Sequence, residues 1–247
     1  MPNAQTAYGV RFDWGVAGAR SVGRGATVSV VVDVLSFTTT VSVALDAGTA
    51  VLPWPHSQEG AAAFAAERRA TLAVSRAEAG PGQFSLSPAS LRLGAPPARL
   101  VLPSPNGATV ADAVGGTCLA GSLRNADAVA TWIAAHHDPA TTSVAIIAAG
   151  ERWPDDTLRP AVEDLWGAGA LVAALRDEGW TDLSPEAGTT AAVWDSVAPD
   201  VSATLLSCAS GRELVAAGFR DDVLIAGEVN ASTSVPLLLN GSFQPAS

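Results

Sequence analysis

Residues 29–40 have the sequence SVVVDVLSFTTT, and this stretch decides the predicted fold. The β-branched run at 27–34 is typical of a strand covered on both faces, and the threonines open a helical segment at 38–47. Asp33 interrupts this apolar run. A carboxylate in such a place has a large desolvation cost unless a cation or several hydrogen-bond donors hold it. Asp33 is therefore the first candidate functional residue.

Short apolar runs alternate with alanine-rich segments along the rest of the chain. The runs predict strands at 27–34, 49–54, 71–75, 99–103, 117–120, 143–149 and 222–227. The alanine-rich segments have helical spacing and predict helices at 38–47, 58–69, 106–114, 125–136, 160–178 and 205–217. This alternation indicates an α/β protein, a three-layer α/β/α sandwich with a mostly parallel, mixed sheet. Because no linker or repeat interrupts the pattern, we expect a single domain over residues 1–247.

Two segments carry more local predictions. The helix at 160–178 is expected to end at Gly179, since a glycine commonly follows the last helical residue. Residues 76–98 break the alternation and predict a long ordered loop, a type of segment that often carries function in a compact domain.

The composition excludes several classes of partner. The formal net charge is −10, with 14 arginines as the basic residues, which disfavours nucleic acid and anionic membranes as partners. We find no apolar run near the ~18 residues of a membrane helix and no leader-like N-terminus, so we expect a cytoplasmic protein. Cys118 and Cys208 are far apart and outside any metal-binding spacing, so neither a disulfide framework nor a zinc site is indicated. A homodimer is one candidate for the oligomeric state, which the sequence does not fix.

Polar side chains concentrate where the predicted strands end. Ligands bind at the carboxyl ends of strands in open parallel sheets, where helix N-termini also point. The residues at these positions are Asp33, Thr38, Thr39, Thr40, His56, Arg76, Ser104, Asn106, Gly107, Ser122, Arg124, Asn125, Glu151 and Arg152. Several have ordinary alternatives: Thr38 and Asn106 suit helix caps, Asn106 and Gly107 form a common turn pair, and Glu163 with Asp164 would offset a helix dipole.

Taken together, these residue types favour an anion site with a metal. Hydroxyls, an asparagine and glycine amides at helix N-termini suit phosphate, which predicts roles for Thr38, Thr39, Thr40, Ser104, Asn106, Gly107, Ser122 and Asn125. Arg124 and Arg152 are predicted to bind a second anion of the substrate. Carboxylates from several strands suit Mg²⁺, and the predicted ligands are Asp33, Glu151, Glu163 and Asp164.

Five stretches resemble the ComB family, the 2-phosphosulfolactate phosphatases. VVVDVLSFTTTVSVALDAGTAVLPWP resembles its DVLRATTT signature, PSPNGAT its TTNGT turn, and LAGSLRNADAVATWI its G-S-x-x-N-A-x-A helix start. AAGERWPDDTLRPAVEDLWGAGAL is similar to its AGE loop and EDxxxAG helix, and SGRELVAAGFRDDVLIAGEVNASTSVPLL to its C-terminal block. The similarity runs in order from about residue 8 to residue 243.

The resemblance implies a Mg²⁺-dependent phosphatase that converts (R)-2-phospho-3-sulfolactate to 3-sulfolactate and phosphate on the family's α/β/α fold. On this basis Asp33, Glu151 and Asp164 are the predicted catalytic residues, and the substrate is a small phosphorylated acid. The chain departs from the family at Ser36, where an arginine is expected, and at Ser85, where an aspartate is expected. Arg76 and Arg124 are two candidates to replace the missing arginine. The departures also motivate a second hypothesis, a catalytically degenerate homologue that binds a phosphorylated metabolite without turnover. A third is another transfer enzyme on the same scaffold.

Overall fold

The computed structural model of the chain describes residues 4–55 and 60–246, in which apolar strands and alanine-rich helices alternate. The elements of the first half are β1 (Val10–Trp14), α1 (Gly15–Ser21), β2 (Val28–Val32), α2 (Phe37–Asp46), β3 (Ala50–Trp54), α3 (Ala61–Arg68), β4 (Thr71–Leu72), α4 (Pro88–Leu93), β5 (Arg99–Pro103), α5 (Gly107–Ala113) and β6 (Thr117–Gly121). Those of the second half are α6 (Ala126–His136), β7 (Val144–Ala148), β8 (Glu151–Arg152), β9 (Leu158–Arg159), α7 (Val162–Asp177), α8 (Pro185–Val197), the short 3₁₀ helix η2 (Ala198–Asp200), α9 (Val201–Ser207), α10 (Ala209–Ala216), α11 (Arg220–Ala226), β10 (Pro236–Leu239) and β11 (Ser242–Pro245).

A mixed sheet forms the centre of the molecule. Within the described ranges it has nine strands in the order β1-β7-β2-β6-β10-β11-β3-β5-β4. The strands β1, β7, β2 and β6 are parallel to one another, and so are β3, β5 and β4. The antiparallel hairpin of β10 and β11 joins these two groups by pairing with β6 on one side and β3 on the other. The predicted α/β class with a mostly parallel, mixed sheet is confirmed.

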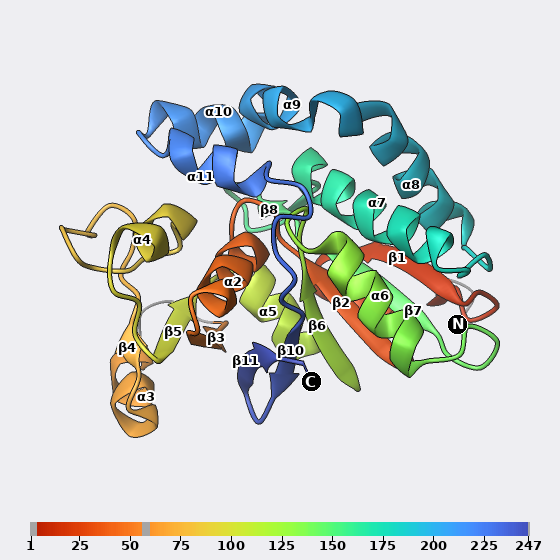
Figure 1. Ribbon diagram of the computed structural model, residues 1–247, viewed down its shortest axis with the longest axis horizontal. Helices are drawn as coiled ribbons and strands as arrows, with labels where there is room; N and C mark the ends of the chain where they lie inside the picture. The colour runs from red at the N-terminus through yellow and green to blue at the C-terminus, as the bar shows by residue number, and fades with distance from the viewer. Residues whose placement is uncertain (1–3, 56–59, 247) are drawn as a thin grey trace.

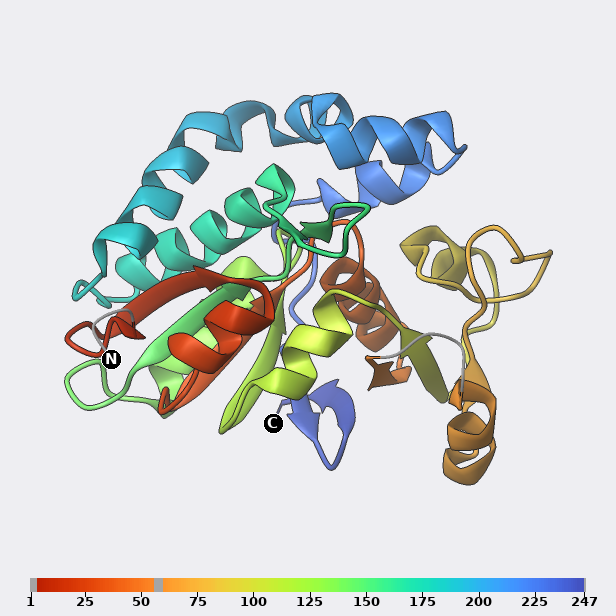
Figure 2. The same ribbon diagram turned by 180° about the vertical axis from the view of Figure 1, so that it is seen from behind.

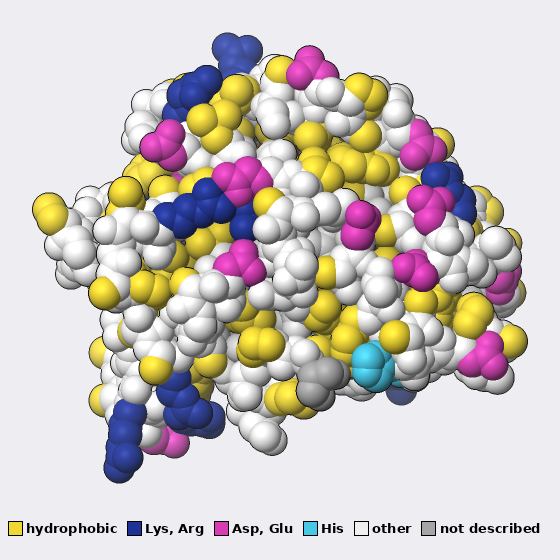
Figure 3. All heavy atoms as spheres, viewed as in Figure 1, with side chains coloured by type: hydrophobic (Ala, Val, Ile, Leu, Met, Phe, Trp, Pro, Cys, Tyr) yellow, Lys and Arg dark blue, Asp and Glu magenta, His cyan; other side chains and the backbone are white. Residues whose placement is uncertain are grey.

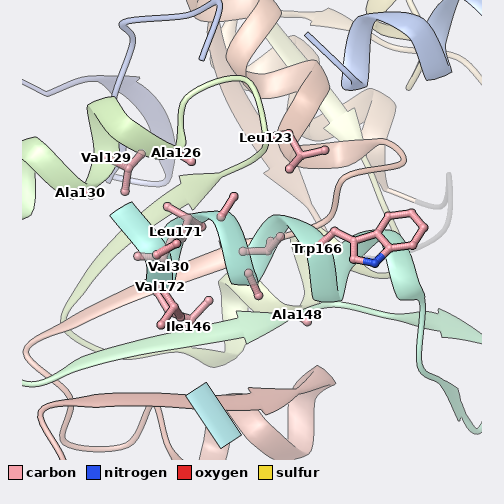
Figure 4. Close-up of a cluster of buried hydrophobic side chains, with 14 of the residues drawn as sticks. Val30, Leu123, Ala126, Val129, Ala130, Ile146, Ala148, Trp166, Leu171 and Val172 are labelled. Atoms are coloured by element: carbon pink, nitrogen blue, oxygen red, sulfur yellow. The ribbon is translucent and has the colours of Figure 1, made fainter. Parts of the chain in front are cut away.

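Strand β2 is buried on both faces, as its unbroken apolar sequence predicts. Val30 and Val32 belong to a core cluster with α6 and α7, whereas Val31 belongs to a second cluster with α1, α2 and α5. Figure 4 shows Val30, Ile146, Leu171 and Val172 packed between the strands and α7. Figures 1 and 2, taken together, show helices on both sides of the sheet, with α6 and α7 on one side and α1 and α5 on the other. Successive side chains of one strand therefore hold the two outer layers.

The structure corrects one predicted strand and adds several elements. Residues 222–227 were expected to form a strand, but residues 222–226 lie in helix α11, and Gly227 follows its last residue. The helix buries Val223, Ile225 and Ala226. A run of about six apolar residues does not distinguish a strand from a buried helix by periodicity. The predicted loop at 76–98 contains the short helix α4. The strand predicted at 71–75 is β4, which has only two residues. Gly179 has a φ of +94° just beyond α7, which confirms the predicted end of that helix.

Several helices lie outside the sheet. Helices α8 to α11 form a continuous band along one side of the molecule, and α4 lies against α11 (Figure 1). On the face shown in Figure 3, basic side chains gather over α3 and elsewhere alternate with acidic and apolar surface. Across the described part of the chain, no helix combines the length and apolarity needed to cross a membrane.

Candidate functional site

Asp33 lies at the carboxyl end of β2 and is held by main-chain amides. Its Oδ1 accepts a hydrogen bond from the amide of Phe37 at 3.0 Å, and its Oδ2 accepts one from the amide of Gly107 at 2.9 Å. Only 6% of the residue is exposed. The donors that the sequence required for this carboxylate are therefore the N-termini of two helices, α2 and α5.

Gly107 permits the close approach of α5 to Asp33. A Cβ atom at this position would lie 2.6 Å from Asp33 Oδ2 and would also collide with the ring of Phe37. The Asn-Gly pair is therefore more than a turn: it lets a helix amide reach a buried carboxylate.

A second buried carboxylate, that of Asp164 in α7, accepts a hydrogen bond from the loop that follows β2. Its Oδ1 accepts from the amide of Val34 at 2.7 Å, and its Oδ2 accepts from the amide of Gly150 at 2.8 Å. Gly150 has a φ of +68°, a left-handed conformation that favours glycine. Asp164 thus connects the loop after β2 with the loop after β7.

Two glutamates complete what we call the acidic cluster, which consists of Asp33, Glu151, Glu163 and Asp164. Glu151 follows β7, and its Oε2 accepts from Asn106 Nδ2 at 2.8 Å. Glu163 precedes Asp164 in the first turn of α7 and is 2% exposed.

Burial and mutual repulsion raise the pKa values of Asp33, Glu151 and Asp164. Burial, reinforced by Glu163 and opposed by amide bonds and by Arg76, raises the pKa of Asp33 to about 6. Burial together with Asp33 and Glu163 raises the pKa of Glu151 to about 7. The pKa of Asp164 is raised well above its usual range for the same reasons. Such mutual repulsion is what a bound cation would relieve.

The acidic cluster offers oxygen donors, the ligand type that a hard divalent cation takes. Within residues 4–55 and 60–246, no group of three or more His, Cys, Asp or Glu side chains is arranged so that it could hold a metal ion. Mg²⁺ does not require one, because it usually takes one or two protein carboxylates together with waters and substrate phosphate. The four carboxylates are oxygen donors only, which suits Mg²⁺ better than a softer metal.

The hydroxyls of the three threonines of α2 donate hydrogen bonds within the protein. Thr38 Oγ1 donates to the carbonyl of Asp33 at 2.8 Å, Thr39 Oγ1 to that of Val34 at 2.8 Å, and Thr40 Oγ1 to that of Leu86 at 2.9 Å. All three residues are fully buried. Because each hydroxyl hydrogen is already donated to a carbonyl, the predicted direct contact of these hydroxyls with phosphate is not supported. They shape the loop that presents Asp33.

Ser122, Arg124 and Asn125 also have structural partners. The side-chain oxygen of Asn125 accepts from the amide and the hydroxyl of Ser122 at 2.8 and 2.9 Å, which locks the turn before α6. The Arg124 guanidinium bonds to Asp46 at 2.9 Å and to Glu228, and it is 2% exposed. Asp46 is the last residue of α2, about 13 Å along the helix from its first turn. The predicted contact of these three residues with substrate is therefore not supported.

Asn106, Glu151 and Arg152 line a pocket of about 180 Å³ beside the acidic cluster. Arg152 bonds to Asp156 Oδ1 at 2.8 Å and reaches the carbonyl of Pro105 at 3.4 Å. Asn106 uses its side chain on Glu151 and makes no side-chain cap, so the capping alternative for it is wrong. Ser104 is buried, and its amide donates to the carbonyl of Trp54 at 3.0 Å. His56 lies outside the described residues.

Arg76 is the residue whose position the sequence left open. Its Nη2 donates to Ser36 Oγ at 2.6 Å, next to the loop that holds Asp33. Between the two candidates for the arginine that the resemblance expects at position 36, the structure therefore favours Arg76. Its partner Asp222, at 3.3 Å from Arg76 Nε, was missed because it lies in a segment expected to be a strand. Two acidic residues in the first turn of a helix were the available signal.

The fold and the acidic cluster define an α/β protein with a candidate active site at the carboxyl edge of a parallel sheet. The 2-phosphosulpholactate phosphatase family matches residues 19–241. A probable 2-phosphosulfolactate phosphatase of Thermus thermophilus is 34% identical over 218 residues, which cover 85% of this chain and 87% of the relative. A 2-phosphosulfolactate phosphatase of Methanothermobacter thermautotrophicus is 28% identical over 222 residues, which cover 89% of this chain and 90% of the relative. The chain belongs to the 2-phosphosulfolactate phosphatase family, a family of phosphoric monoester hydrolases. This confirms the resemblance of the motifs.

Proposed function

We propose that the protein is a Mg²⁺-dependent phosphatase that hydrolyses (R)-2-phospho-3-sulfolactate to 3-sulfolactate and phosphate. The observation that carries this proposal is the acidic cluster, whose carboxyl groups come from the loops after β2 and β7 and from α7. Family membership supports the substrate class. The retained carboxylates favour turnover over the hypothesis of a degenerate homologue.

In this proposal one or two carboxylates of the acidic cluster (Asp33, Glu151, Glu163 and Asp164) would hold the cation, with waters and substrate phosphate as its other ligands. When bound, such an ion would supply charge neutralisation at the phosphoryl group and a more acidic water, which are effects worth several kcal/mol in such reactions. The amides of Phe37 and Gly107 fix the orientation of Asp33, and those of Val34 and Gly150 fix that of Asp164. Both carboxylates are therefore preorganised before substrate binds.

Phosphate binding is assigned to main-chain groups rather than to threonine hydroxyls. Within the described chain, the amides of Leu35 and Ser36 donate to no acceptor, and they precede the first turn of α2. Amides at a helix N-terminus are suited to phosphate oxygens. Asn106 and Arg152 line the adjacent pocket and supply further donors. Glu151 also lines this pocket, and in this proposal its carboxylate accepts the proton of the attacking water.

The test is phosphate release from 2-phosphosulfolactate by the purified protein, with Mg²⁺ and with EDTA. We expect release that depends on Mg²⁺ and that falls by about 10²-fold or more in Asp33→Asn. Asp177→Asn is the matched control, because Asp177 ends α7 and its side chain is 78% exposed. Binding of the phosphorylated acid without phosphate release would instead support the degenerate homologue.

We also propose a cytoplasmic location and a homodimer. Light scattering on the purified protein measures the mass of the assembly. A monomer at micromolar concentration would contradict the dimer without affecting the proposed reaction.

A further inference from the structure

The side chain of Arg76 is fixed from three separate segments of the chain. Its Nη2 donates to Ser36 Oγ at 2.6 Å and to the carbonyl of Leu86 at 3.1 Å, and its Nε donates to Asp222 Oδ2 at 3.3 Å. The guanidinium carbon lies 5.5 Å from the centre of the Phe219 ring. The orientation of this cation is therefore set before any ligand arrives.

Arg76 lines a second cavity and also bonds to Ser36, in the loop that follows Asp33. A pocket of about 400 Å³, which we call the loop pocket, lies between the segment 76–94 and residues 218–222. Its lining includes Arg76, Ser85, Ser87, Ser90, Phe219 and the acidic residues Asp221 and Asp222. Helix α4, on the first of these segments, lies against α11, as Figure 1 shows. Burial raises the pKa of Asp33, and the charge of Arg76 is one of the smaller effects that oppose this rise.

Donor capacity remains at this cation. An arginine carries five N–H donors, and Nη1 holds two of them. Among the residues that the structure describes, Nη1 has no hydrogen-bond partner. The side chain is 19% exposed, so it is accessible from the loop pocket. Asp222 accepts from Arg76 only at Nε, through its Oδ2. Its other oxygen, Oδ1, accepts from Ser87 Oγ at 2.5 Å and from the amide of Ala89 at 3.3 Å.

We propose that Arg76 and the loop pocket form the subsite for the second acidic group of the substrate, a sulfonate or carboxylate, while the phosphate lies at the acidic cluster. Arginine suits this role because its donors match the oxygens of such anions. The proposal rests on the proposed function and deepens it. Such a subsite makes the protein selective for phosphate esters that carry a second acidic group over phosphate esters that carry none.

If Arg76 only connects the segment 76–94 to α11, its replacement should affect the hydrolysis of all phosphate esters equally. We compare hydrolysis of 2-phosphosulfolactate with that of p-nitrophenyl phosphate, which has no second acidic group, in Arg76→Ala, Arg76→Gln and Arg76→Lys. For 2-phosphosulfolactate we expect kcat/KM to fall by about tenfold or more, through a rise in KM. For p-nitrophenyl phosphate we expect it to fall by less than about twofold. Arg76→Lys should restore part of the difference. Equal losses on both esters overturn the proposal.

A binding measurement separates the proposal from the proposed function. Calorimetry with 3-sulfolactate, which carries both acidic groups but no phosphate, requires no turnover. The wild type should bind it, and Arg76→Gln should bind it about tenfold more weakly or worse. Arg92→Ala is the matched control, because Arg92 is on α4 and pairs with Glu228 away from the pocket lining. If the wild type releases no phosphate but binds 3-sulfolactate through Arg76, the phosphatase proposal fails and the subsite stands. If binding is absent, or unchanged in Arg76→Gln, the subsite is refuted.

Discussion

The carboxylate of Asp164 binds the amide of Val34 at 2.7 Å, across 130 positions of sequence. Its other oxygen binds the amide of Gly150, so one side chain of α7 fixes the loops that carry Asp33 and Glu151. The relative positions of three carboxyl groups therefore depend on this residue.

Replacement of Asp164 by asparagine should weaken both the fold and the activity. One side-chain position would become an NH₂ group facing a main-chain N–H, which leaves a buried donor unsatisfied and costs about 1–3 kcal/mol. Urea denaturation measures the stability, and Mg²⁺-dependent phosphate release measures the activity. The exposed Asp177→Asn on the same helix should match the wild type in both assays. An Asp164→Asn protein of wild-type stability would contradict this assignment.

A methyl group at Gly107 should separate α5 from Asp33. The added Cβ would lie 2.6 Å from Asp33 Oδ2, so the helix start or the Phe37 ring must move, which we expect to cost about 1–3 kcal/mol. Thermal melting reports this loss, and phosphate release should fall with it. Gly115→Ala is the control, because a Cβ there meets nothing within 4 Å. Comparable melting temperatures for the two variants would refute the close-approach role of Gly107.

The metal-free protein should lose stability as the pH rises between about 5 and 7. The native pKa of Asp33 is about 6 and that of Glu151 about 7, both above the values of 3.8 and 4.5 from which they are raised. The folded state therefore binds more protons than the unfolded state in this window, and stability falls as they are released. Denaturation in EDTA at several pH values should show this slope, with a shallower slope in Glu151→Gln. Mg²⁺ at pH 8 should raise the unfolding midpoint, and a slope of opposite sign would contradict the acidic cluster.

Arg124 should affect stability without affecting catalysis. Arg124→Gln removes the cation from Asp46 and Glu228, whose side chains are 32% and 37% exposed. Because these partners are partly hydrated, we expect a loss of about 1–3 kcal/mol rather than the larger cost of a fully buried pair. Steady-state kinetics of the folded variant should give kcat/KM within about twofold of the wild type. A selective rise in KM for the acidic substrate would instead restore Arg124 to the site.

The sequence predicted the part of the site that depends on local position. Asp33, Gly107 and Glu151 follow strands, and the parallel arrangement of those strands brings them to one edge, so their proximity could be predicted without a structure. Asp164 was also identified, although its bonds to Val34 and Gly150 were not. These bonds depend on how α7 packs against the sheet.

The failures involve pairings over long sequence separations. Arg124 looked like a ligand-binding residue because its partners Asp46 and Glu228 lie 78 and 104 positions away. The threonine hydroxyls looked available because their acceptors are main-chain carbonyls, which a residue pattern does not show. The strand expected at 222–227 is a helix because its apolar side chains pack beneath α9 and α10, a contact that hydrophobic periodicity alone does not encode.

The hairpin at 236–245 has a consequence for the order of assembly during synthesis. Its two strands lie in the middle of the sheet, between β6 and β3, although they are the last strands of the described chain to be made. No strand pairing connects the two parallel groups until the hairpin between them has been made. A nascent chain that stops at residue 235 would therefore expose two unpaired inner edges, β6 and β3, and would be open to association with other chains.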